Sequence, residues 1–266
     1  MKHVARKRFG QHFLADRSVL ERIVEAIDPR PGDELLEIGP GPGALTAALI
    51  ERAGRIRAIE IDRDLARALR ARFPPASLEL IEGDALKFDY RSLPCGMRLV
   101  GNLPYNISTP LLFRISICSD RFRDLHFMLQ KEVVARMAAM HSTPDYGRLS
   151  VMLQHRFRVE RLFDVPAAAF RPAPQVKSSM VRLTPRSVLE RGDVDEESLR
   201  HVVSAAFSHR RKTLENALSG VLPASVIVAQ GIEPSLRPEN LSLANYVSLA
   251  GAFSRLTREK EPIPKA

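Results

Sequence analysis

Hydrophobic positions in the first part of the chain follow two periodicities. Short apolar runs predict buried strands, and longer segments with an apolar residue every three to four positions predict helices. The predicted helices lie at residues 17–28, 45–50, 65–72, 110–117 and 132–140. The predicted strands lie at residues 34–38, 56–61, 78–81, 98–101, 126–129, 149–155 and 180–183. Strands that alternate with helices predict a doubly wound α/β fold with a mostly parallel sheet, which binds ligands at the carboxyl ends of its strands.

The pattern changes after the proline-rich segment 166–174. From about residue 185 the apolar periodicity is helical throughout and includes no predicted strand. The predicted helices of this part lie at residues 195–218, 224–230 and 241–256. We therefore expect a catalytic domain at residues 1–184, a small all-helical domain at residues 185–258, and a disordered tail at residues 259–266.

Charge and cysteine content narrow the class of protein. The 266 residues carry a formal net charge of +9, which favours a polyanionic partner such as nucleic acid. Cys95 and Cys118 are too few for a disulfide framework or a cysteine zinc site, so we expect a protein of the reducing cytoplasm without a metal. No apolar stretch is long enough to cross a bilayer, which predicts a soluble protein without a membrane partner.

A glycine-rich turn follows the strand predicted at residues 34–38. Gly39 and Gly41 let the backbone fold tightly and approach a ligand, although nicotinamide and flavin enzymes use a similar turn. Glu60 ends the next strand, where its carboxylate can accept hydrogen bonds from two ribose hydroxyls. Asp84 ends the third strand, where it can accept one from an adenine amino group. Together these residues favour S-adenosylmethionine, a methyl donor with an adenosine and an amino-acid part.

The fourth predicted strand ends in an Asn-Leu-Pro-Tyr corner formed by Asn102, Leu103, Pro104 and Tyr105. The exocyclic amine of a purine is a poor nucleophile because its lone pair is delocalised into the ring. The Asn102 side-chain oxygen and the backbone carbonyl of Leu103 or Pro104 can each accept one N–H, which orients the nitrogen lone pair. Tyr105 offers a face on which a flipped-out base can stack. The corner therefore predicts methyl transfer to a planar amine.

Two basic clusters are candidates for RNA contact. Arg6, Lys7 and Arg8 form a basic arm in which aromatic residues are interleaved. The second cluster is Arg210, Arg211 and Lys212, predicted on a helix. A solvated basic stripe explains the second cluster equally well. Phosphate contacts of this kind orient a partner without reading its bases.

The chain also resembles a known family, the small-subunit (16S) ribosomal RNA adenine N6,N6-dimethyltransferases. The resemblance rests on the motifs at residues 6–14, 37–41, 101–110, 170–176 and 207–214. It implies a Rossmann-like methyltransferase domain and a substrate of two adjacent adenosines near the 3′ end of small-subunit ribosomal RNA. Each exocyclic amine would receive two methyl groups, in a cytoplasmic and monomeric enzyme of small-subunit biogenesis.

The resemblance also implies roles for individual residues. The residues that would hold the cofactor are His12, Leu14, Gly39, Glu60, Asp84 and Asn102. Phe170 would lie against the target base, opposite Tyr105. Two positions depart from the family pattern, because His12 stands where many relatives have Asn and Lys177 where many have Asp.

Three other functions remain open at this point. A large-subunit ribosomal RNA adenine methyltransferase shares the cofactor turn and the corner, but the motifs at residues 101–110 and 170–174 fit the small-subunit enzymes better. A ribosome-assembly factor, in which binding outweighs catalysis, has the same sequence features. A nicotinamide oxidoreductase is compatible with the glycine turn alone.

Overall fold

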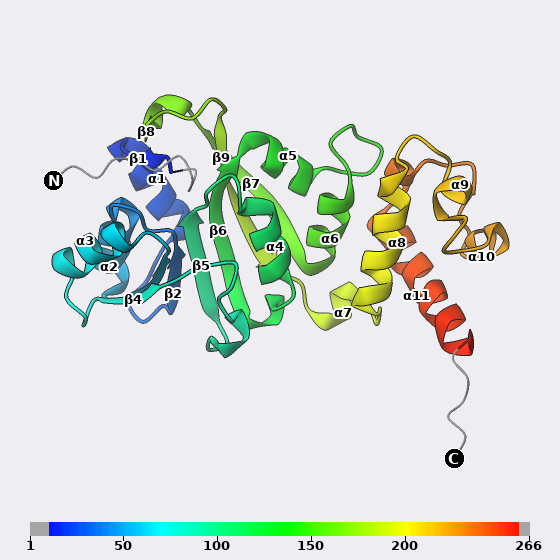
Figure 1. The fold of residues 1–266 in the computed structure, drawn as a ribbon, viewed down its shortest axis with the longest axis horizontal. Coiled ribbons are helices and arrows are strands. Elements are labelled where there is room, and N and C mark those ends of the chain that lie inside the picture. Colours follow the sequence, from blue (N-terminus) through cyan, green and yellow to red (C-terminus); the bar gives the residue numbers. More distant parts are fainter. Residues whose placement is uncertain (1–10, 261–266) are drawn as a thin grey trace, which may run out of the picture. The chain divides into compact units, whose positions relative to one another are not determined.

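A seven-stranded sheet forms the first part of the protein, in a computed structural model that describes residues 11–260. The strand order is β4-β3-β2-β5-β6-β9-β7 (Figure 1). The strands are β2 (Leu35–Ile38), β3 (Ile56–Glu60), β4 (Leu78–Glu82), β5 (Met97–Asn102), β6 (Phe122–Gln130), β7 (Phe157–Val165) and β9 (Ser178–Pro185). Strands β4, β3, β2, β5 and β6 are mutually parallel, whereas β9 and β7 are antiparallel to their neighbours. The expected α/β fold with a mostly parallel sheet is confirmed.

The chain order places a crevice at one edge of this sheet. From β2 the chain moves outward through β3 and β4, and it then returns to the other side of β2 to form β5 and β6. The carboxyl ends of β2 and β5 therefore meet where the winding direction reverses, which is the usual ligand site of such sheets. The connecting helices are α2 (Ala44–Ala53), α3 (Arg63–Arg72), α4 (Ser108–Ser116) and α5 (Lys131–Ala138).

Helix α1 (Arg17–Ile27) precedes the sheet. It begins where predicted, because the Asp16 carboxylate accepts hydrogen bonds from the backbone N–H groups of Ser18 and Val19. Just before it, the short strand β1 (Phe13–Leu14) pairs with β8 (Phe170–Arg171) in a separate two-stranded sheet. Residues about 160 positions apart in the sequence are thereby joined at the entrance to α1.

The chain divides into two compact units. One contains the residues up to Val134 and Phe157–Pro185, and the other contains Ala135–Arg156 and the residues from Arg186 onward. The second unit is helical, with α6 (Arg148–Arg156), α7 (Val188–Arg191), α8 (Glu196–Ser208), α9 (Leu214–Leu218), α10 (Ala224–Ala229) and α11 (Leu243–Lys260). Its core includes Val151 from α6 and Leu199 from α8. Ala135–Arg156 thus differs from the expected division, which placed it in the catalytic domain.

Three predicted elements were wrong. Residues 149–155 form helix α6 and no strand. Residues 195–218 form two helices, α8 and α9, with a turn between them. The proposed tail begins inside α11, which continues to Lys260, and its remaining residues lie outside the described part of the chain.

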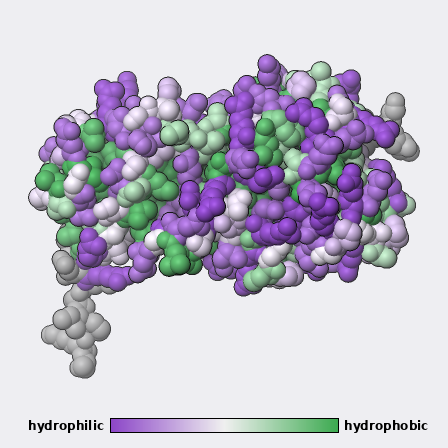
Figure 2. All heavy atoms as spheres, turned by 180° about the vertical axis from the view of Figure 1, so that it is seen from behind, coloured by the Kyte–Doolittle hydropathy of each residue, from purple (hydrophilic) through white to green (hydrophobic). Residues whose placement is uncertain are grey.

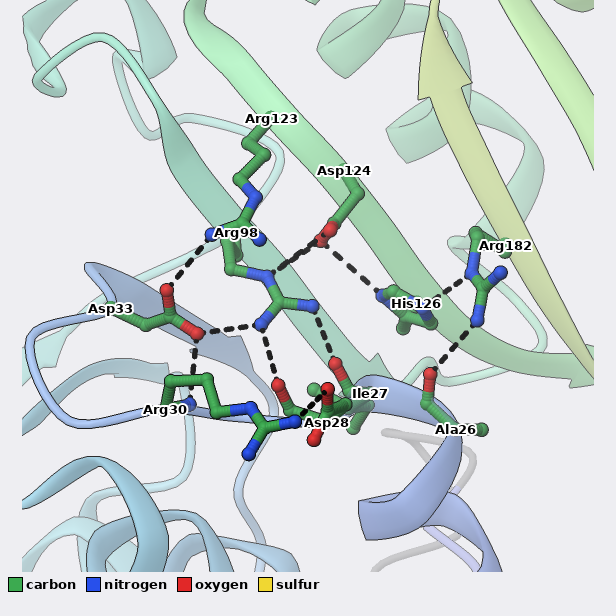
Figure 3. A network of polar contacts seen from close by, with 10 residues as sticks. All are labelled: Ala26, Ile27, Asp28, Arg30, Asp33, Arg98, Arg123, Asp124, His126 and Arg182. Carbon is green, nitrogen blue, oxygen red and sulfur yellow. Dashed lines mark hydrogen bonds and ion pairs between the residues drawn. The ribbon is translucent and has the colours of Figure 1, made fainter.

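A network of ion pairs lies at the amino-terminal ends of β5 and β6, at the opposite end of the strands from the crevice (Figure 3). Arg98, at the start of β5 and 4% exposed, contacts Asp33 at 2.7 Å and Asp124 at 2.9 Å. Its guanidinium also donates to the backbone oxygens of Ile27 and Asp28, at the end of α1. Arg98 therefore ties the end of α1 to β5 and β6, and this accounts for its burial despite its charge.

No helix among residues 11–260 is long and apolar enough to cross a membrane. Hydrophilic side chains dominate the face shown in Figure 2, with smaller apolar areas between them. Cys95 is exposed and Cys118 is buried, and both are free thiols.

Candidate functional site

A pocket of about 210 Å³ lies at the carboxyl edge of the parallel strands. It is lined by residues that follow β2, β3, β4 and β5, together with residues beside β1. The predicted site residues that line it are His12, Gly39, Gly41, Glu60, Asp84, Asn102, Leu103, Pro104 and Tyr105. The strand-end residues named from the sequence are thus brought together in one cavity.

The glycine turn forms one wall of this pocket. Gly41 has a φ of +57°, and a Cβ there would come within 3.1 Å of the Phe13 ring. A Cβ on Gly39 would point toward the corner, 3.9 Å from Pro104 Cδ and 4.0 Å from the Asn102 backbone oxygen. The glycines therefore keep open a space between the turn and the corner that a side chain would fill. A bound ligand can approach the backbone closely there.

Glu60 is buried at the end of β3. Its carboxylate accepts the Gly41 N–H at 3.1 Å and the Asp62 N–H at 2.9 Å. Burial raises the pKa of Glu60, although these backbone hydrogen bonds oppose the shift. Each carboxylate oxygen keeps a further acceptor site. Glu60 therefore both holds the glycine turn and has the capacity to accept hydroxyl groups of a ligand.

Asp84 follows β4 on the same side of the pocket. Its Oδ1 accepts the Leu86 N–H at 2.9 Å, so the side chain turns back on its own loop. The Gly83 N–H donates to the Glu60 backbone oxygen at 2.9 Å, which fixes the two strand ends relative to each other. Glu60 and Asp84 therefore lie on adjacent strand ends, as the sequence indicated.

The Asn102 amide has a defined orientation. Its Nδ2 donates to the His12 backbone oxygen at 2.8 Å. A carbonyl oxygen can only accept, so the NH₂ group must face His12 and the side-chain oxygen must face away from it. That oxygen has no hydrogen-bond partner among residues 11–260. One hydrogen bond to the backbone thus leaves the Asn102 side-chain oxygen available as an acceptor.

The two backbone carbonyls of the corner differ. The Pro104 oxygen accepts the Ile107 N–H at 3.2 Å, at the entrance to α4. The Leu103 oxygen accepts no hydrogen bond from the described residues. The open carbonyl is therefore that of Leu103, immediately after Asn102.

Tyr105 is half-buried and has one hydrogen-bond partner and one stacked ring beside it. Its hydroxyl lies 2.7 Å from Ser178 Oγ, and the His12 ring stacks on it with centroids 5.5 Å apart and an interplanar angle of 27°. Burial raises the pKa of Tyr105, so the phenol stays protonated in the neutral range. Ser178 was missed by the sequence analysis, because it is 73 positions away and has no local motif.

Not every predicted residue reaches the pocket. Leu14 lines a smaller cavity behind the glycine turn. Phe170 is fully buried in the core of the sheet unit and does not line the pocket, and its contact with the target base stays a prediction. Its backbone pairs with Leu14, which explains its burial. Arg6, Lys7 and Arg8 lie outside the described residues.

The second basic cluster lies in the helical unit, in the turn between α8 and α9. It was predicted within one helix, and the structure corrects this. Arg210 contacts Glu239 at 2.6 Å and donates to the Pro144 backbone oxygen. Arg211 and Lys212 are exposed, and their side chains have no partner among residues 11–260. Two of the three cations are therefore available for a polyanion.

Glu37, just before the glycine turn, is a further buried acid that the sequence analysis did not single out. It is 2% exposed, and Thr46 Oγ1 donates to it at 2.6 Å. Burial raises its pKa to about 7, and the charge of nearby Glu60 adds to this effect. It lines the smaller cavity together with Gly39, Gly41 and Asn102.

Comparisons with known proteins agree with this geometry. The family model for ribosomal RNA adenine dimethylase matches residues 2–254. The ribosomal RNA small subunit methyltransferase A of Aromatoleum aromaticum is 55% identical over 93% of this chain and 94% of its own length. The protein of that name from Laribacter hongkongensis is 50% identical over 97% of this chain and 99% of its own length.

Two solved structures are similar along most of the chain. A dimethyladenosine transferase from Plasmodium falciparum has a TM-score of 0.80 and 25% identity, over 92% of this chain and 98% of that one. The 23S ribosomal RNA methyltransferase ErmE has a TM-score of 0.68 and 26% identity, over 91% and 99%.

The glycine turn, the strand-end acids and the Asn-Leu-Pro-Tyr corner, on a Rossmann-like sheet, define the class as a methyltransferase. Within that class, the chain belongs to the ribosomal RNA adenine dimethylase family.

Proposed function

We propose that this enzyme transfers methyl groups from S-adenosylmethionine to the N6 amines of two adjacent adenosines near the 3′ end of small-subunit ribosomal RNA. The products are N6,N6-dimethyladenosines. Family membership and the names of the relatives support the reaction. The observation in the structure that carries it is the Asn102 side chain, held by the His12 backbone with its oxygen available beside the open Leu103 carbonyl.

These two oxygens suit a planar amine. An adenine N6 group has two N–H bonds in the plane of the ring. If Asn102 and Leu103 each accept one, the nitrogen is held in a fixed orientation and the positive charge that develops on it is stabilised. Tyr105, whose hydroxyl is fixed by Ser178, presents an aromatic ring on which the extruded base can stack.

The pocket also fits the cofactor. Gly39 and Gly41 keep the wall open, the Glu60 carboxylate retains acceptor capacity for ribose hydroxyls, and Asp84 lies on the adjacent strand end. When bound, S-adenosylmethionine supplies an electrophilic methyl group on a sulfonium. Apolar residues complete the lining, and Ile61, which is 45% exposed, is one of them. Burial of an apolar side chain of this kind by a ligand is favourable.

The substrate is a large polyanion, which agrees with the net charge of +9. We assign Arg211 and Lys212 to phosphate contacts, and Arg210 to a structural pair with Glu239. We place the reaction in the cytoplasm, where small subunits mature, and we expect the enzyme to act as a monomer.

The experiment is tritium transfer from labelled S-adenosylmethionine to small subunits that lack these methyl groups, followed by identification of the labelled nucleoside. The expected product is N6,N6-dimethyladenosine. Asn102→Ala removes one of the two acceptors and should lower the rate by at least 100-fold, with the folded state checked by thermal unfolding. Label in protein, or N6-methyladenosine as the only labelled nucleoside, would refute the proposal.

A further inference from the structure

The second methyl transfer acts on a base that offers fewer hydrogen bonds than the first. In each transfer the amine nitrogen forms a bond to the methyl carbon, the bond from that carbon to sulfur breaks, and its electron pair stays on sulfur. The amine cation then loses one H⁺ to water. After the first transfer the nitrogen carries one methyl group and a single N–H. Only one of the two oxygens of Asn102 and Leu103 can then accept a hydrogen bond from it.

Stacking must therefore contribute more to the orientation of a monomethylated base. A base that is held by two hydrogen bonds keeps its amine in place even when the ring beneath it moves. A base that is held by one hydrogen bond can turn about that bond unless the stacking surface is fixed. The proposed stacking surface is the ring of Tyr105. The contacts that fix this ring should therefore matter most for the second transfer.

Ser178 holds the Tyr105 ring by its hydroxyl group. The two side-chain oxygens lie 2.7 Å apart, and Ser178 is fully buried, so bulk water does not compete for this hydrogen bond. A second contact, the stacked ring of His12, lies against the tyrosine ring and does not hold its hydroxyl. Without Ser178 the half-buried phenol would turn to find another partner, because a buried polar group without a hydrogen bond costs free energy.

The antiparallel strand β9 explains how Ser178 reaches the pocket edge of the sheet. Ser178 is the first residue of β9, and it pairs with Gln130, the last residue of β6. The start of β9 thus lies at the carboxyl edge of the parallel strands, where Tyr105 follows β5. On its other side Ser178 pairs with Val165, the last residue of β7 (Figure 1). Because β9 lies between two strands, Ser178 is a fixed anchor for the tyrosine.

We propose that Ser178 is a positioning residue for the second methyl transfer. Through its bond to the Tyr105 hydroxyl, it fixes the surface on which the monomethylated adenine is oriented. The inference rests on the proposed function. Ser178 does not line the pocket, so its effect passes through the tyrosine ring. The hydroxyl of Tyr105, in addition to its aromatic ring, therefore contributes to dimethylation.

Ser178→Ala tests the proposal, because it removes the hydroxyl group and little else. In single-turnover assays on undermethylated small subunits, we expect the first methylation to slow by less than about threefold. The second should slow on the order of 10-fold, so that N6-methyladenosine accumulates. The KM for small subunits should stay within about twofold of the wild-type value, because phosphate contacts supply most of the affinity. Equal slowing of both steps, or an unchanged ratio of monomethyl to dimethyl product, would overturn the assignment.

Ser179→Ala is the matched control. Ser179 is the next residue of the same strand and is equally buried, but its hydroxyl donates to Asp164 at 2.6 Å and not to Tyr105. Asp164 keeps its ion pair with Lys131 in this variant. Ser179→Ala should therefore lower stability without changing the ratio of products. A similar rise of monomethyl product in both variants would mean that β9 has loosened as a whole, and it would refute the specific role of Ser178.

A double-mutant cycle separates an effect through Tyr105 from a general loss of structure. Tyr105→Phe keeps the aromatic ring and removes the hydroxyl. On its own it should raise the ratio of monomethyl to dimethyl product, as Ser178→Ala does. The double variant should be no worse than either single variant, because both changes break the same hydrogen bond. Additive defects would show that Ser178 acts by another route and would refute the proposal.

A further measurement does not depend on activity. The chain has four tyrosines, so the ring signals of ¹³C-labelled tyrosine are few enough to assign one by one. In the free protein the Tyr105 signal should shift in Ser178→Ala and stay in place in Ser179→Ala. An unchanged Tyr105 signal in Ser178→Ala would mean that the hydrogen bond is not made, which would also refute the proposal. The proposed function fails separately, if the wild-type enzyme forms no N6,N6-dimethyladenosine.

Discussion

Replacement of Glu37 by Gln should change how stability depends on pH. Glu37 is buried beneath the glycine turn, and its pKa rises from an ordinary 4.5 to about 7 in the folded protein, mainly because burial disfavours the charged form. The folded state therefore holds the proton more tightly than the unfolded chain. The stabilisation by this proton is fully present below pH 4.5 and is lost as the pH rises to about 7 and beyond. Gln has nearly the same shape as Glu, and its side-chain oxygen can still accept the hydrogen bond from Thr46, but Gln does not titrate.

The difference between the folded and unfolded pKa values corresponds to about 3 kcal/mol at alkaline pH. The free energy of unfolding of Glu37→Gln minus that of the wild type should therefore increase by about 3 kcal/mol between pH 4.5 and pH 8. Other titrating groups act in both proteins and largely cancel in this difference. Removal of the Glu37 charge also eases ionisation of Glu60, which acts in the same direction.

Urea unfolding of both proteins at several pH values measures this difference directly. Glu51→Gln is the control, since Glu51 is exposed on α2, and its difference from the wild type should stay flat. A flat difference for Glu37→Gln as well would refute the reasoning, because it would mean that Glu37 is ionised at no cost in its buried position.

Three further predictions concern stability and binding. Arg98→Met should lower the free energy of unfolding by about 3–5 kcal/mol in urea titrations, because it leaves the partly buried Asp33 and Asp124 carboxylates without their buried cation; a loss below about 1 kcal/mol would contradict this. Gly101→Ala should cost about 1–3 kcal/mol in the same assay, since its Cβ would lie 2.5 Å from the Ile38 oxygen; an unchanged midpoint would show that the strands can move apart. Replacement of both Arg211 and Lys212 by Ala should weaken binding to small subunits. It should also reduce the slope of log affinity against log salt concentration by about 2. An unchanged slope would rule out phosphate contacts by these two side chains.

The pocket could be predicted because its residues carry local signals. Glu60, Asp84 and Asn102 are polar residues that lie at or just after the ends of successive apolar strands. The parallel arrangement then brings these ends together without any further information. Sequence reasoning was sufficient where the position of a residue follows from its own strand.

The wrong secondary-structure predictions concern segments whose structure is determined by tertiary contacts. Residues 149–155 are a short apolar run that periodicity cannot assign, and they form a helix because Val151 and its neighbours pack against α8. Strand β7 (Phe157–Val165) was missed because charged residues interrupt its alternation, as is common at the edge of a sheet. The turn at residues 209–213 contains neither Gly nor Pro, so nothing in the sequence marks the end of α8.

Contacts between distant residues were also inaccessible. The sequence could not show that the strand of Phe170 pairs with Leu14 and that its ring lies in the core. The bond from His12 to the Pro172 oxygen joins residues 160 positions apart and decides the tautomer of the imidazole. No pattern within one segment contains that information.

The pairing of β1 with β8 has a consequence for the synthesis of the protein. The pocket wall formed by His12 and Phe13 depends on a partner strand at Phe170–Arg171, so it cannot form until about two-thirds of the chain has left the ribosome. A nascent chain with the glycine turn and the corner already made still has an incomplete site. The enzyme therefore becomes competent only late in its own translation, and cannot modify RNA while its synthesis is at an early stage.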